Sequence, residues 1–86
     1  MTQALAHRLA ELRRQSKLTA SEVCDRTGIG LGTLADLEDG ECQFPQSMDL
    51  RTLARVYGGD NAQDVQELYI ELMVLAGHLI PRKEGN

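Results

Sequence analysis

The segment that decides the fold is "LTASEVCDRTGIGLGTLADLEDG", residues 18–40. Thr19 can accept a hydrogen bond from the first turn of a helix, and Glu22, three residues later, can reach back to the backbone of Thr19. Gly28 can adopt the left-handed conformation in which many helices end. These signals predict a helix over residues 20–27.

A second helix is predicted almost immediately after the first. Ile29 and Leu34 have the spacing of a hydrophobic staple around Gly30 as the capping residue, and Gly40 can end the helix after Asp39. Two short helices joined by such a brief turn have the order of a helix-turn-helix motif.

Three further helices are predicted around this pair. Apolar residues recur at helical spacing on one face of residues 3–16. Ser47 is a candidate cap for a helix over residues 48–57, and Asn61 is one for a helix over residues 62–79. Because no stretch shows the alternation that is typical of strands, the predicted class is all-α with five helices.

The charge of the chain limits how it could hold nucleic acid. The 86 residues carry a formal net charge of −4, whereas domains that bind nucleic acid by bulk charge are usually basic. Residues 1–29 hold five Lys or Arg against three acids, and residues 30–75 hold two Arg against nine acids. Any contact with nucleic acid must therefore come from local positive charge. The length suits one domain, predicted at residues 1–80, with a flexible tail at 81–86.

Enzymes, metal proteins and membrane proteins are not favoured. Cys24 and Cys42 are too few for a zinc site even with His7 and His78, and we expect no metal and no cofactor. The glycines of "GIGLG" lack the preceding strand of a nucleotide-binding loop, and no nucleophile has a nearby base, so we expect no enzymatic activity. The most apolar run is too short to cross a membrane, and we expect a cytoplasmic protein.

Over residues 5–59 the chain resembles the Cro and lambda-repressor type (XRE) of helix-turn-helix proteins. The resemblance rests on residues that build the fold rather than on any single motif. They are Leu9, Leu12, Arg13, Leu18, Glu22, Val23, Gly28, Ile29, Thr33, Leu34, Leu37, Glu38, Gly40, Pro45, Leu50, Leu53 and Ala54. The resemblance implies a five-helix lambda-repressor-like domain that regulates transcription, typically as a repressor, by binding double-stranded DNA.

The resemblance also implies which residues would read DNA. The helix at residues 31–39 would lie in the major groove, with its first residues at the base edges. Leu31 could touch a thymine methyl group, Thr33 could donate or accept a hydrogen bond, and Asp36 could accept from a cytosine amino group. Because no arginine is present for guanine, specificity would be modest or would depend on DNA shape.

Contacts to the DNA backbone would surround that helix. Gly30 and Gly32 would allow close approach, and Ala20 stands where the family often has a glutamine that contacts the backbone. By analogy, the remaining phosphate contacts would come from Arg14, Lys17, Arg26, Gln43, Ser47 and Arg51. Asp36, Asp39 and Glu41 would be repelled by the same phosphates.

Two further roles follow from the resemblance. Glu38 would bond Arg13 and hold the first and third helices together, which is a structural role. The helix at residues 62–79 has apolar residues on more than one face, so one face would close the core while another would pair two copies as a homodimer. The residues predicted for dimerisation are Leu68, Tyr69, Leu72, Met73, Leu75 and Ala76.

A second hypothesis is that the motif has become a protein-interaction module with little or no DNA binding. Leu31, Asp36, Asp39 and Glu41 would then form an acidic surface that docks on a basic protein partner. The acidity of the would-be reading helix motivates this alternative.

Overall fold

The computed structural model describes residues 3–79, and this part of the chain contains five α-helices and no strand. The helices are α1 (Gln3–Ser16), α2 (Ala20–Thr27), α3 (Leu31–Asp39), α4 (Ser47–Gly58) and α5 (Ala62–Leu75). The predicted all-α class is confirmed, and the predicted bounds of the first three helices match those observed. The tail predicted at residues 81–86 lies outside the described residues.

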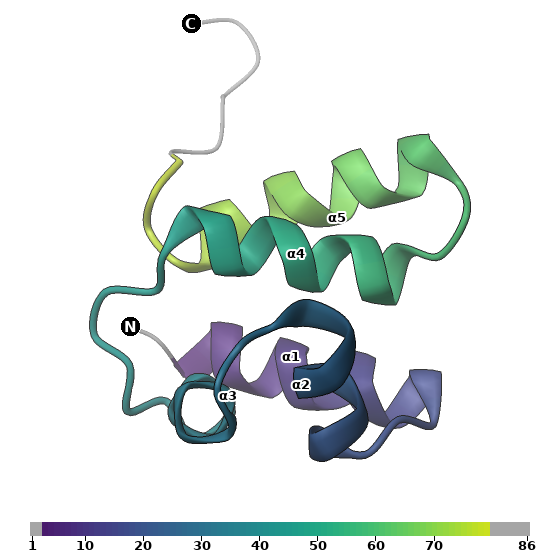
Figure 1. Ribbon diagram of the computed structural model, residues 1–86. Helices are drawn as coiled ribbons and strands as arrows, with labels where there is room; N and C mark the ends of the chain where they lie inside the picture. The colour runs from purple at the N-terminus through teal and green to yellow at the C-terminus, as the bar shows by residue number, and fades with distance from the viewer. Residues whose placement is uncertain (1–2, 80–86) are drawn as a thin grey trace, which may run out of the picture.

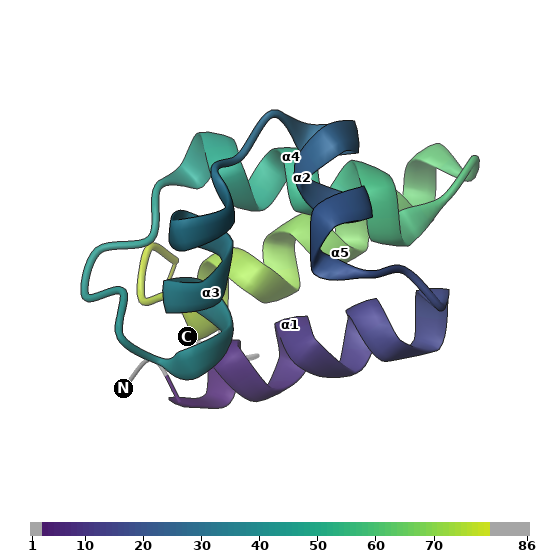
Figure 2. The same ribbon diagram turned by 60° about the horizontal axis from the view of Figure 1, so that its bottom comes forward.

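The helices form two groups that enclose one core. Figure 1 shows α4 and α5 side by side above α1, α2 and α3. Figure 2 shows α3 crossing α1 near the N-terminal end of α1. The contacts between helices agree with these views, because α4 packs mainly against α5 and α2, whereas α1 packs mainly against α3. One side of α3 is therefore left free of other helices.

The core is apolar throughout and every helix contributes to it. No polar or charged residue among residues 3–79 is buried, so the hydrophobic effect is its main source of stability, at roughly 1.5–3 kcal/mol for each fully buried large side chain. Its members are Leu5, Leu9, Leu12, Val23, Ile29, Leu34, Leu37, Leu50, Leu53, Ala54, Leu68 and Leu72.

Two predicted helix boundaries are wrong. Ser47 is the first residue of α4 and not its cap; Gln46 takes the cap position without a side-chain hydrogen bond. The last helix ends at Leu75 rather than Leu79, because Gly77 adopts a φ of 84° and the chain turns back. The ring of His78 then hydrogen-bonds the carbonyl of Pro45, which joins the end of α5 to the loop before α4.

Gly58 sets how closely α4 and α5 approach. A Cβ atom at this position would lie 2.7 Å from Val65 Cγ2 and 2.9 Å from Val65 Cα. The second distance is to the backbone of α5, so rotating a side chain cannot relieve the clash. The antiparallel pair therefore requires glycine at position 58.

We predict that Gly58→Ala lowers the free energy of unfolding by roughly 1–3 kcal/mol, because the new methyl group must push α5 away from α4. Urea unfolding followed by circular dichroism measures the change. The control is Gly32→Ala, whose new methyl group meets no atom within 4 Å. Equal stability of the Gly58→Ala variant and the wild type would show that the two helices can separate at no cost.

Candidate functional site

The turn between α2 and α3 is built by hydrogen bonds of its own residues. At the start of α2, the Thr19 N–H donates to Glu22 Oε1 (2.8 Å) and the Glu22 N–H donates to Thr19 Oγ1 (3.1 Å). The pKa of the Glu22 carboxyl is lowered, chiefly by the hydrogen bond that it accepts from the Thr19 backbone. At the end of α2, Gly28 has a φ of 79°. The predicted capping box and glycine cap are thus both present.

Only Gly28, Ile29 and Gly30 separate the two helices. The Ile29 N–H donates to Thr27 Oγ1 (3.1 Å), and the Ile29 side chain is buried in the core. Gly30 caps α3 with extended backbone and has no side chain to accept a hydrogen bond. The first turn of α3 therefore presents its N–H groups and the positive end of the helix dipole without a side-chain cap.

The outward face of α3 holds all three residues predicted for base contact. Leu31, Thr33 and Asp36 are exposed, and the Leu31 residue keeps 57% of its accessible surface. Leu34 and Leu37, on the opposite face, are buried. All three predicted residues are thus accessible. We call the exposed part of α3 the α3 face, which also includes Gly30, Gly32 and Ala35.

The two glycines of the α3 face are not required by packing within the chain. A Cβ atom at Gly32 would meet nothing within 4 Å, and one at Gly30 would meet only Thr33 Oγ1, at 3.9 Å. Neither residue has a positive φ. Glycine within a helix costs up to about 1 kcal/mol relative to alanine. The fold alone therefore does not account for Gly32.

An ion pair fixes α3 to α1. The guanidinium group of Arg13 donates to both carboxylate oxygens of Glu38, at 2.8 Å from Nε to Oε2 and 3.0 Å from Nη2 to Oε1. The two side chains keep only 26% and 11% of their accessible surface. The Arg13 pKa is raised chiefly by the hydrogen bond to Glu38. The pair joins two helices and is largely shielded from solvent.

Tyr57 of α4 lies close enough to this pair for the two charges to affect the pKa of its hydroxyl. The pKa of the Tyr57 hydroxyl is raised to about 12, chiefly by burial and also by the charge of Glu38, whereas Arg13 acts to lower it. The hydroxyl is buried and has no hydrogen-bond partner among the described residues. Tyr57 therefore stays neutral and serves packing.

Positive side chains lie in exposed positions at the ends of the first two helices. Arg14 is in the last turn of α1, Lys17 follows it with a φ of 59°, and Arg26 is in the last turn of α2. None of the three forms an ion pair within residues 3–79. Gln43 and Ser47 are also exposed, and Ala20 is half-buried. All of these except Ala20 are therefore accessible to a ligand.

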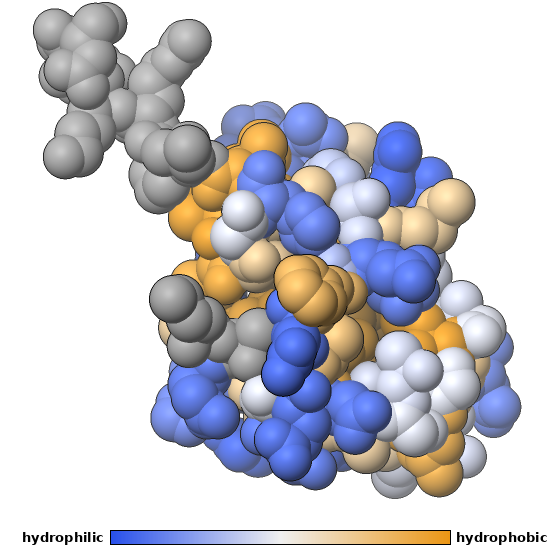
Figure 3. Space-filling model, turned by 90° about the vertical axis from the view of Figure 1, so that its left-hand side faces the viewer, coloured by the Kyte–Doolittle hydropathy of each residue, from blue (hydrophilic) through white to orange (hydrophobic). Residues whose placement is uncertain are grey.

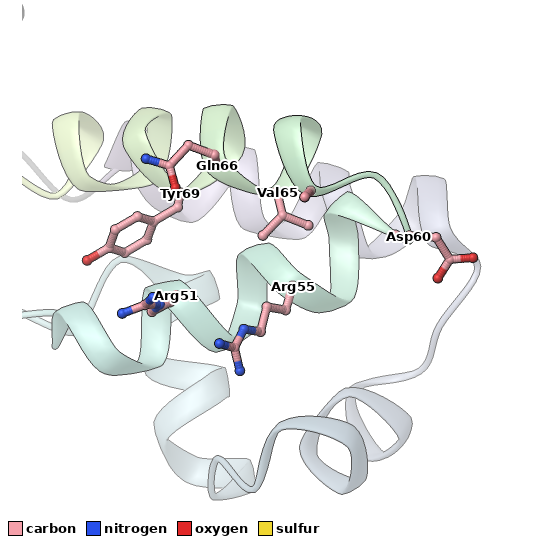
Figure 4. A pocket seen from close by; sticks show the side chains of 8 residues that line it. Arg51, Arg55, Asp60, Val65, Gln66 and Tyr69 are labelled. Atoms are coloured by element: carbon pink, nitrogen blue, oxygen red, sulfur yellow. The ribbon is translucent and has the colours of Figure 1, made fainter.

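Arg51, one of the residues predicted to contact phosphates, lies on α4 beside Tyr69 of α5. Its guanidinium carbon is 5.9 Å from the centroid of the Tyr69 ring of α5. Figure 4 shows Arg51 on α4 near Tyr69 at the groove between these two helices. The contact of Arg51 with the DNA backbone remains a prediction.

The residues predicted for dimerisation do not share one free surface. Leu68 and Leu72 are buried in the core of the chain itself, so they cannot contact a second copy. Tyr69, Met73, Leu75 and Ala76 are half-buried and pack against that core. The large apolar residues of this region that are exposed are Ile70 and Leu79, and neither was in the predicted set.

Sequence reasoning also missed two exposed apolar residues near α3. Phe44 keeps 83% of its accessible surface and Met48 keeps 72%. Figure 3 views the end of the molecule where the loop before α4 and the C-terminal end of α5 lie, and apolar surface is visible there among polar residues. A phenylalanine beside Pro45 in an otherwise polar loop was the signal that could have identified this surface.

No group of His, Cys, Asp and Glu within residues 3–79 could hold a metal ion. None of the described helices has the length and apolarity that crossing a membrane requires. Cys24 and Cys42 are half-buried and not bonded to each other.

Comparison with known proteins gives one match. A family model described as "Helix-turn-helix domain" matches residues 4–68, which include α1 to α4 and the first half of α5. No curated protein and no solved structure matches the chain.

The Arg13–Glu38 pair leads to a prediction about stability. We expect Glu38→Gln to lower the free energy of unfolding by roughly 1–3 kcal/mol, because Arg13 would lose its charged partner where little water reaches it. Glu71→Gln is the matched control, since Glu71 accepts from Arg8 at 2.8 Å but its side chain keeps 42% of its accessible surface. That exposed pair should contribute under about 1 kcal/mol. Urea unfolding measures the free energy of unfolding of both variants. An equal decrease in the two would contradict the prediction.

Proposed function

The chain belongs to the helix-turn-helix domain family, and from this premise we propose that it is a small regulator of transcription that binds double-stranded DNA. In this proposal α3 enters the major groove and the start of α2 meets the DNA backbone. The observation that carries the proposal is the α3 face, which is exposed, has no side-chain cap and holds glycines that packing does not explain.

Base contacts in this proposal come from Leu31, Thr33 and Asp36. A methyl contact, a hydroxyl and one carboxylate discriminate bases less well than the paired hydrogen bonds of an arginine. Gly30 and Gly32 let the backbone of α3 approach the DNA closely, so that N–H groups of its first turn can meet a phosphate. Sequence preference would then depend partly on groove width.

Phosphate contacts come from Arg14, Lys17 and Arg26, with Gln43 and Ser47 as neutral donors. The three cations are exposed and free of ion pairs within the described residues. Because few phosphates would be neutralised, affinity should fall less steeply with salt than it does for a basic repressor.

The proposal also includes repression and dimerisation. Bound DNA is blocked to other proteins, so the chain would act as a repressor, and two copies would read two half-sites. The surface that we propose for pairing consists of Ile70, Met73 and Leu79, since Leu68 and Leu72 belong to the core.

The alternative proposal is a protein-interaction module. Asp36, Asp39 and Glu41 are exposed near the exposed Leu31, which favours a basic partner with an apolar contact point. The two proposals use the same surface, and they make opposite predictions for how binding changes when negative charge is removed from it.

We predict that Gly32→Ala leaves the free energy of unfolding unchanged or raises it by up to about 1 kcal/mol, yet weakens DNA binding about tenfold. The methyl group favours the helix but stands between α3 and the DNA. Fluorescence anisotropy with a duplex selected by the wild-type protein from a random library at low salt measures the affinity.

Gly59→Ala is the control for that experiment. Gly59 has a φ of 74° and lies outside α3, so alanine there should reduce stability and leave DNA affinity unchanged. Failure of the wild-type protein to enrich any duplex at low salt would contradict the DNA-binding proposal itself.

Asp39→Asn separates the two proposals, because Asp39 is an exposed acid of α3 to which the DNA-binding proposal assigns no base contact. If α3 faces DNA, removing the negative charge should strengthen binding about threefold, since a repulsion with phosphates is lost, and the gain should shrink as salt is added. If α3 faces a basic protein, the same change should weaken capture of that partner. Glu67→Gln, an exposed acid of α5, is the matched control and should leave both kinds of binding unchanged.

A further inference from the structure

A groove between α4 and α5 contains a second, separate group of positive side chains. The cavity has a volume of about 290 Å³ and is lined by Arg51, Arg55, Gly59, Asp60, Ala62, Val65, Gln66 and Tyr69. Figure 4 shows Arg51 and Arg55 extending from α4, and Val65, Gln66 and Tyr69 extending from α5. We call this the α4–α5 groove.

The two arginines lie one helical turn apart and their charges are not neutralised. Neither forms an ion pair within residues 3–79. Like charges at this spacing repel each other slightly. The one acid that lines the groove, Asp60, lies on the connecting loop with its carboxylate directed away from both guanidinium groups. In a chain of net charge −4, this is a local excess of positive charge.

The groove also offers an apolar wall. The ring of Tyr69 lies 5.9 Å from the Arg51 guanidinium carbon, which restricts the orientation of that side chain through a cation–π contact. Val65 and Ala62 line the same wall, and the Gln66 amide adds a neutral hydrogen-bonding group. The spacing of the two helices is fixed by the contact of Gly58 with Val65.

We propose that the α4–α5 groove binds a small organic phosphate. Two guanidinium groups can donate paired hydrogen bonds to one phosphoryl group, and a planar or apolar body would fit against Tyr69 and Val65. A carboxylate could be held by the same donors, but a doubly charged phosphoryl group matches two arginines better. The proposal is independent of DNA binding by α3.

The test uses phenyl phosphate and the full chain without DNA. Titration followed by ¹H–¹⁵N NMR should give saturable shifts centred on Arg55, Gly59 and Gln66. Each of Arg51→Gln and Arg55→Gln should raise the Kd about tenfold. The corresponding lysine variants should lose less affinity for phenyl phosphate, because lysine keeps the positive charge but not the paired donors.

The controls distinguish the groove from other positive surfaces. Arg14→Gln removes the same charge outside this groove and should leave the Kd unchanged. Benzoate should bind more weakly than phenyl phosphate, and benzoate binding equally well would overturn the preference for a phosphoryl group. Circular dichroism of each variant verifies that it is folded.

Three results would overturn the proposal. They are the absence of saturable shifts at millimolar phenyl phosphate, an unchanged Kd in the double variant Arg51→Gln with Arg55→Gln, and shifts centred on the first turn of α3. If the double variant instead weakened DNA binding while phenyl phosphate did not bind the wild type, the two arginines would serve the DNA backbone and not a small ligand.

Discussion

The structure depends on the left-handed conformation of Gly28. Because the chain reverses there in three residues, α3 must begin immediately beside the end of α2, and buried Ile29 fixes the turn in the core. The Arg13–Glu38 pair then holds the far part of α3 against α1. With both ends of α3 fixed, Leu34 and Leu37 point into the core and the opposite side of the helix stays accessible. The φ angle of Gly28 thus helps to decide which surface of α3 is accessible to a partner.

Short sequence motifs predicted the helix ends that are formed by residues close together in the chain. The capping box of Thr19 with Glu22, the glycine ends of α2 and α3 and the Asn61 cap of α5 each involve residues within a few positions of one another. The end of α5 also has a local signal, Gly77 with its φ of 84°, which the sequence prediction passed over; only the contact of His78 with Pro45, thirty-three positions away in the chain, has no local signal. The position of Arg51 likewise depends on how α4 is rotated against α5, which no pattern within α4 reveals.

Negative net charge and binding of anions are compatible in this chain because its charges are segregated. The exposed acids Asp36, Asp39 and Glu41 lie on α3 and directly after it, whereas free cations lie at the ends of α1 and α2 and in the α4–α5 groove. Fields of surface charges fade over about 10 Å in ordinary salt, so each group acts largely on its own surroundings. The total charge therefore says little about either proposed surface.

The contact of Gly58 with Val65 has a consequence for selectivity. Since not even a methyl group fits between the two backbones at this point, α4 and α5 cannot come closer together there. In the proposed site, this contact would limit how closely the two walls of the α4–α5 groove approach each other, and so the size of the ligand. Glycine, the smallest residue, would in this way impose the size limit of a site whose chemistry is supplied by arginine.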